Sequence, residues 1–164
     1  MLSARDAVRE SQRIRDELWG KRFPVDPVQI ARRLGIDIRE AKLSPDVAGA
    51  LVKELGKDPA ILLNARDHPN RQRFTCAHEL GHFVSREDAP DAYEYVDLRD
   101  TVFGAVATDP DDGFANAFAA NLVMPEREVR RLRDDGYTPT RMAAYFDVPQ
   151  DAMHGRLKSM KLTG

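Results

Sequence analysis

The segment from Pro69 to Val84 constrains the fold of this chain most, because it has the pattern of a buried helix. Its apolar residues recur at helical spacing in two stripes, one of Phe74, Ala77, Gly81 and Val84 and one of Cys76, Leu80 and Phe83. A helix that is apolar on more than one stripe belongs inside a core. The rest of the chain must therefore cover this helix on several sides.

Two histidines on this helix indicate a metal site. His78 and His82 are four residues apart, so their side chains share one face, roughly 5–6 Å apart, and can reach one ion. Zinc is the ion that this ligand type favours. Glu79 is offset by about 100° around the helix, where it can flank a metal-bound water. Because zinc lowers the pKa of such a water to about 7, a neighbouring carboxylate can act as general base in amide hydrolysis.

A second apolar helix is the place to look for a third ligand. Residues Phe114 to Met124 are apolar nearly all round apart from Asn116 and Asn121, which is typical of a core helix. Asp112 lies at the entry to this helix, where it is either an N-cap or a metal ligand. Asp112 and Asn116 are again four residues apart. We expect Asn116 to accept a hydrogen bond from Nδ1 of a zinc-bound histidine.

Two glycines fit this arrangement. Gly81 is unfavourable in a helix interior, so we expect a second helix to approach closely there. Gly113, beside Asp112, is a candidate for permitting a closer approach at the site itself. Two packed helices would then supply the ligands and their support together.

The sequence His-Glu-Leu-Gly-His at 78–82, followed by Phe-Ala-Asn-Ala-Phe-Ala-Ala-Asn-Leu-Val-Met-Pro at 114–125, resembles the ImmA/IrrE family of zinc metallopeptidases. Both motifs agree with the family in order and spacing. The alternating segments 49–54 and 60–64 also look like the hairpin of that family. The resemblance covers residues 26–125 well and the two ends less well.

The resemblance implies an α/β (α+β) fold, a small zincin-like domain with a short antiparallel or mixed sheet packed on a metal-binding helix pair. It also implies a single Zn²⁺ ion bound by His78, His82 and Asp112, with Glu79 as the base. The family usually has Glu where this chain has Asp112, so the ligand here is one methylene shorter.

Two alternatives to Asp112 remain open at this point. Asp111 is a rival ligand, although its partner four residues later is Ala115 and Asn116 would then lose its expected role. In the second alternative, no acidic residue takes the third ligand position, and the domain is a degenerate relative that does not hydrolyse peptides.

The remaining segments complete the expected domain. We expect helices over 4–19 and 28–34, a strand over 36–39, and a hairpin closed around 56–59. An edge of this hairpin is either a site for an extended substrate strand or is covered by the chain itself. The polar stretch 85–109 is expected to be a surface loop or a flexible cover, from which Tyr93 or Tyr95 could reach an oxyanion.

The sequence predicts residues 1–125 as the metallopeptidase domain and 126–164 as a C-terminal helical bundle packed on it as one unit. Within the second part, 140–146 and 151–160 have the rhythm of a helix-turn-helix, with Arg156, Lys158 and Lys161 adding positive charge. An alternative function is therefore a DNA-binding or protein-binding regulator with a structural or vestigial metal site. The net charge of −2 argues against tight DNA binding.

Composition leads to the remaining expectations. A pI near 6.1 gives no global attraction to nucleic acid or to an anionic membrane. There is no long apolar run and no signal-peptide pattern, so we expect a cytoplasmic protein without membrane association. The lone Cys76 should be a buried, inert thiol. The expected function is a zinc endopeptidase that makes limited cuts in a partner protein, which the resemblance implies is a helix-turn-helix repressor in a regulatory or stress response.

Overall fold

The computed structural model describes residues 2–87, 91–103 and 109–162. In these ranges the helices are α1 (Ala4–Leu18), α2 (Pro27–Arg33), α3 (Pro69–Ser85), α4 (Arg99–Phe103), α5 (Pro110–Val123), α6 (Glu126–Asp134), α7 (Pro139–Phe146) and α8 (Gln150–Ser159). The strands are β1 (Asp37–Ala41), β2 (Val47–Lys53), β3 (Ala60–Asn64) and β4 (Tyr93–Leu98). No helix among the described residues is both long and apolar enough to cross a membrane.

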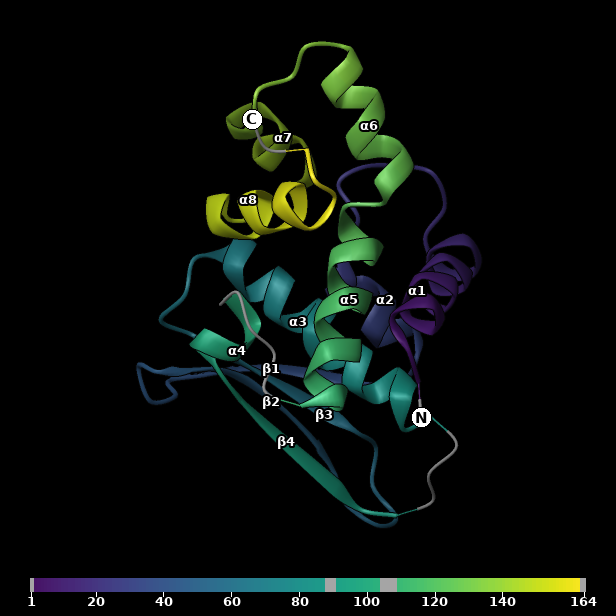
Figure 1. The fold of residues 1–164 in the computed structure, drawn as a ribbon. Coiled ribbons are helices and arrows are strands. Elements are labelled where there is room, and N and C mark those ends of the chain that lie inside the picture. The colour runs from purple at the N-terminus through teal and green to yellow at the C-terminus, as the bar shows by residue number, and fades with distance from the viewer. Residues whose placement is uncertain (1, 88–90, 104–108, 163–164) are drawn as a thin grey trace.

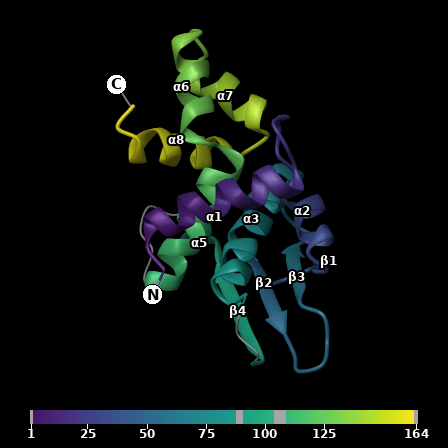
Figure 2. The same cartoon turned by 90° about the vertical axis from the view of Figure 1, so that its right-hand side faces the viewer.

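The strands form a mixed sheet in the order β1-β3-β2-β4. β1 and β3 are parallel, whereas β2 is antiparallel to both β3 and β4. The helices lie on one side of this sheet, with α3 against it and α5 and α1 beyond, and α6, α7 and α8 at the end farthest from the sheet (Figure 1 and Figure 2). The predicted α+β class is confirmed.

Close contact between α3 and α5 forms the centre of the core. A Cβ atom on Gly81 would lie 2.9 Å from the Cα of Ala115 and 3.1 Å from the Cβ of Phe118. Glycine is therefore required where the two helices meet, as the sequence predicts. The expectation for Gly113 is wrong, because a Cβ there would meet nothing within 4 Å.

Two arginine side chains, the half-buried Arg15 and the buried Arg156, hold flanking helices to the C-terminal end of α5. Arg15 of α1 donates to the carbonyl oxygens of Asn121 and Leu122 at 2.8 and 3.2 Å. Arg156 of α8 donates to the carbonyl of Met124 and to the side chain of Asn121, both at 3.0 Å. These bonds satisfy acceptors that a helix end leaves unpaired. Arg156, which the DNA-binding alternative needs on the surface, thus faces the interior.

The described part of the stretch 85–109 is not simply a loop, because it contains β4 and α4. Residues 88–90 and 104–108 of this stretch lie outside the described residues. β4 pairs with β2, and β1 pairs with β3, so each strand of the predicted hairpin has a neighbour on both sides. The hairpin edge is therefore covered by the chain itself and does not offer the expected position for a substrate strand. The alternating sequence Tyr-Glu-Tyr-Val-Asp-Leu at 93–98 is typical of a strand, but the polar residues around it are more typical of a surface loop.

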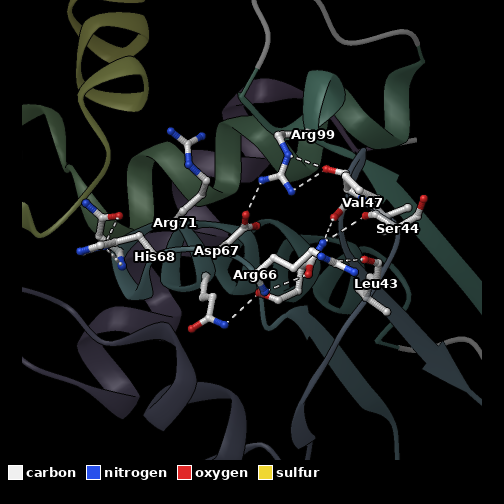
Figure 3. Close-up of polar contacts among 12 residues, drawn as sticks. Leu43, Ser44, Val47, Arg66, Asp67, His68, Arg71 and Arg99 are labelled. Carbon is white, nitrogen blue, oxygen red and sulfur yellow. Dashed lines mark hydrogen bonds and ion pairs between the residues drawn. The ribbon is translucent and has the colours of Figure 1, made fainter.

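Arg99 fixes the end of β4 to two loops (Figure 3). Its guanidinium donates to the carbonyl of Pro45 at 2.9 and 3.1 Å and to Oδ1 of Asp67 at 2.6 Å. Its backbone N–H donates to the carbonyl of Asp46 at 2.8 Å. The start of β2, the entry to α3 and the end of β4 are therefore held together by one side chain.

The contact at Gly81 predicts a specific cost of a small substitution. In Gly81→Ala, a methyl group meets backbone atoms of α5, and overpacking of this kind costs about 1–3 kcal/mol, more than the roughly 1 kcal/mol of helix propensity gained. Urea unfolding should therefore show a less stable protein. Gly155→Ala in α8 is the matched control, because its Cβ meets nothing within 4 Å and it should be neutral or stabilising. Equal effects of the two changes would contradict this packing.

Candidate metal centre

The two histidines of α3 are completely buried and point to the same place. Their ring centroids are 4.7 Å apart and nearly perpendicular, at 84°. Nδ1 of His78 lies 2.7 Å from Oδ1 of Asn116. The amide of Asn116 is oriented by donation from its Nδ2 to the carbonyl of Thr101 at 3.0 Å. Since Oδ1 can only accept, Nδ1 of His78 donates to it, and Nε2 is the ring nitrogen that faces the cluster.

Asp112 joins this cluster from the first turn of α5. Its Oδ1 lies 3.3 Å from Nε2 of His82 and 3.9 Å from Nε2 of His78. The N-cap of α5 is Asp109, whose side chain accepts a hydrogen bond from the backbone N–H of Asp112 at 2.9 Å. The capping role that Asp112 could have had is thus taken by another residue. Asp111 is exposed and instead lies 3.4 Å from the hydroxyl of Tyr95.

Asp97 is a fourth member of the cluster, and the sequence analysis does not predict it. Its Oδ2 lies 3.2 Å from Nε2 of His78 and 3.3 Å from Nε2 of His82. It reaches them from β4, where Tyr93, Tyr95 and Asp97 alternate with the exposed Glu94, Val96 and Leu98. A buried carboxylate on a strand cannot be assigned from local spacing to a helix that precedes it by about fifteen residues.

The donor atoms of the cluster fit a metal ion. One ligand atom each from His78, His82, Asp97 and Asp112 lies within 4.8 Å of the others. Within the described parts of the chain, both histidine Nε2 atoms and Oδ2 of Asp97 are buried and have no hydrogen-bond partner. Buried polar atoms left without a partner are costly, and a cation between them would satisfy all three. Two imidazoles with carboxylate oxygens are a donor set that zinc accepts.

Glu79 lies beside this cluster rather than in it. Its carboxyl group is fully buried, and neither oxygen has a hydrogen-bond partner among the described residues. Burial raises the pKa of Glu79 well above its usual value, and the negative charges of Asp97 and Asp112 raise it further. A carboxyl group with a raised pKa in a buried site is suited to proton transfer near neutral pH.

The surroundings of the cluster shift the pKa values of Asp97 and Asp112 in opposite directions. Burial alone would raise the pKa of Asp97, but its contacts with His78 and His82 outweigh burial and lower that pKa. The pKa of Asp112 is raised, first by burial and then by the negative charge of Asp97. The two carboxylates therefore repel one another, which a cation between them would relieve.

Neighbouring side chains fix the site in place. The ring of Tyr95 stacks on His82 with centroids 3.9 Å apart and planes 12° apart. Gly49 of β2 lets the sheet approach α3, because a Cβ there would lie 2.7 Å from both Cγ2 of Thr75 and the carbonyl oxygen of Leu62. Cys76 is buried as predicted, and burial raises the pKa of its thiol, so it stays protonated.

A buried cluster of imidazole and carboxylate side chains, next to a further carboxyl group with a raised pKa, is the kind of site that metal-dependent hydrolases use. Comparison with known proteins agrees with this class. Residues 31–158 match the model of the Peptidase_M78 family, the IrrE N-terminal-like domain. The chain therefore belongs to this metallopeptidase family.

Two relatives match parts of the chain. The radiation response metalloprotease IrrE of Deinococcus radiodurans is 33% identical over 78 residues, which cover 44% of this chain and 21% of that protein. The uncharacterized immunity region protein 2 of Bacillus phage phi105 is 25% identical over 131 residues, which cover 79% of this chain and 77% of that protein. The alignment thus spans about a fifth of the Deinococcus protein and most of the phage protein.

Asn116 provides a test of how the histidine is held. In Asn116→Ala, His78 loses the acceptor for its Nδ1 proton, and loss of such a partner typically weakens metal binding 10–100-fold. Competition with a chelator would measure the zinc affinity. Asn116→Asp keeps an acceptor oxygen and should bind zinc far more tightly than the alanine variant. Unchanged affinity in Asn116→Ala would contradict this role.

Asp112 and Asp111 form a second matched pair. Asp112→Ala should weaken zinc binding by about 100-fold or more, since even supporting residues contribute 10–100-fold. Asp111→Ala, one residue away and exposed, should leave the affinity near that of the unchanged protein. The opposite ranking would identify Asp111 as the ligand.

Proposed function

We propose that this chain is a zinc-dependent endopeptidase of the His-Glu-x-x-His type that makes limited cuts in a partner protein. The observation that carries the proposal is the convergence of His78, His82 and Asp112 in one buried cluster, with the Glu79 carboxyl group beside it. Membership of a metallopeptidase family supports the same reading.

In the proposed mechanism, Nε2 of His78, Nε2 of His82 and a carboxylate oxygen of Asp112 would hold the ion. When bound there, zinc would supply Lewis acidity for the scissile carbonyl and would lower the pKa of a water molecule to about 7. Glu79 accepts the proton of the attacking water and later delivers it to the nitrogen of the leaving amine. Because the positive charge of an ion opposes the rise in pKa of Glu79, this carboxyl group can be ionised when substrate arrives.

Supporting residues keep the ligands in one orientation. Asn116 holds His78 in the tautomer whose Nε2 lone pair faces the cluster. The stacked ring of Tyr95 limits rotation of His82. Fixing ligands before the ion binds makes their geometry more favourable for catalysis, since less reorganisation is needed during the reaction.

We propose a helix-turn-helix repressor as the substrate, following the family resemblance of the two sequence motifs. The names of the two relatives, a radiation response metalloprotease and a phage immunity region protein, support a regulatory or stress-response setting. Cleavage of a DNA-bound repressor would require a cytoplasmic location. The boundary between residues 1–125 and 126–164 remains a prediction from the sequence.

The second candidate is a protein-binding regulator whose metal site is structural. The observation that favours it is Asp97, which brings the number of protein donors at the cluster to four, as in structural zinc sites. The DNA-binding form of this alternative is disfavoured by Arg156, whose guanidinium is buried against α5.

Glu79→Gln separates the enzyme from the structural alternative. The variant should bind zinc as the unchanged protein does but lose cleavage of a co-encoded helix-turn-helix repressor by about 10²–10⁴-fold, because the amide cannot accept the proton. Cleavage would be followed by mass spectrometry of the products. Glu94→Gln, an exposed change on β4, is the control and should leave cleavage intact. Full activity in Glu79→Gln would remove the base from this mechanism.

A further inference from the structure

The position of Asp97 bears on whether the ion can be reached by water. A tetrahedral zinc ion at about 2.05 Å from its ligands holds neighbouring ligand atoms about 3.3 Å apart. The distances from Oδ2 of Asp97 to the two histidine Nε2 atoms are 3.2 and 3.3 Å. Oδ1 of Asp112 lies 3.3 and 3.9 Å from the same two atoms. Asp97 therefore fits a ligand position at least as well as Asp112.

Hydrogen bonding does not explain these short contacts. Nδ1 of His78 is engaged with Asn116, and in the neutral ring that a metal ligand requires, Nε2 is an acceptor, as is Oδ2 of Asp97. Two buried acceptors 3.2 Å apart do not stabilise each other without a cation or a proton between them. Because Nε2 of His82 approaches the same oxygen, a shared cation is the arrangement that satisfies all three atoms.

The backbone of the sheet places Asp97 in this position. Asp97 pairs with Gly49, and the register of β2 and β4 shifts between Val47 and Gly49. A register shift of this kind changes which residues face one another, and β-bulges, which produce such shifts, are common beside active sites. Arg99, two residues later, ties the end of the strand to Pro45 and Asp67 (Figure 3). Asp97 is thus held by the fold and does not reach the cluster through a freely rotating loop.

Asp97 pairs with Gly49 of β2, and a Cβ on Gly49 would lie 3.7 Å from Oε2 of Glu79, so Asp97 and Glu79 approach the cluster from neighbouring positions. A general base needs the attacking water beside it. Catalytic zinc sites have three protein ligands and keep one position for water, whereas four protein ligands make a closed site.

Resting on the proposed function, we propose that Asp97 is a fourth protein ligand that occupies the water position beside Glu79. The conformation described here is then a latent form of the protease. It becomes active when Asp97 withdraws from the ion. β4 pairs with β2 alone among the described strands, so its displacement would disturb a single ladder of the sheet. Regulation would act through the position of β4 rather than through loss of the metal.

The test uses cobalt in place of zinc, because its visible spectrum reports the coordination of the ion without any substrate. The unchanged protein should give an intense four-coordinate spectrum that does not respond to added azide. In Asp97→Ala, a position opens to solvent, so azide should shift the spectrum, and cobalt affinity should fall about tenfold or more. Asp97→Asn keeps the size of the side chain and should behave like the alanine variant, which guards against a failure of Asp97→Ala to fold.

Glu94→Ala, on the outward face of the same strand, is the matched control and should keep the closed spectrum. In the presence of saturating zinc, Asp97→Ala should also cleave the repressor faster than the unchanged protein. An azide-responsive spectrum in the unchanged protein, the same as in Asp97→Ala, would overturn the role of Asp97 while leaving the proposed protease intact. Failure of the unchanged protein to bind cobalt or zinc would contradict the proposed function, and this inference with it.

Discussion

The close packing of α3 against α5 is the contact on which the site depends. At Gly81, the two helix backbones approach so closely that a single methyl group would collide with Ala115. This approach brings Asn116 to Nδ1 of His78 and Asp112 to Nε2 of His82. Without it, side chains as short as Asp and Asn could not span the gap between helices. The shorter reach of Asp112, compared with the Glu that the family resemblance implies, is accommodated by this contact and not by Gly113.

The sheet supplies the other side of the cluster. Gly49 lets β2 lie close to α3, and the neighbouring β4 then presents Asp97 to both histidines. The hydrogen bonds of Arg99 connect this strand to the loops that precede β2 and α3. A metal ion bound in this cluster would therefore have ligands from two helices and from a strand at the sheet edge. In the proposed regulation, the position of that strand would control access to the ion.

The two core helices and most of the candidate site could be predicted from the sequence, because the patterns that indicate them are local. The apolar period of α3 and α5, the four-residue spacing of His78 and His82, and that of Asp112 and Asn116 all act within one or two helical turns. The pairing of β4 with β2 is different, since it joins residues about 50 positions apart and its register decides which side chains face inward. In β4 the buried face ends in a carboxylate and the exposed face carries Val96 and Leu98, the reverse of the usual pattern. The sequence alone therefore indicates that Asp97 belongs to a polar loop. The pairing of β4 with β2 shows instead that its side chain faces the two histidines.

Binding of a metal ion between these imidazoles and carboxylates is the property on which the proposed activity and its regulation both depend. A crystal structure of the zinc-loaded protein, with anomalous diffraction recorded on both sides of the zinc edge, tests it most directly. We expect one strong anomalous peak about 2.0–2.2 Å from Nε2 of His78, Nε2 of His82 and a carboxylate oxygen of Asp112. A cluster that stays empty under zinc saturation, or a stoichiometric ion bound elsewhere on the chain, would contradict it.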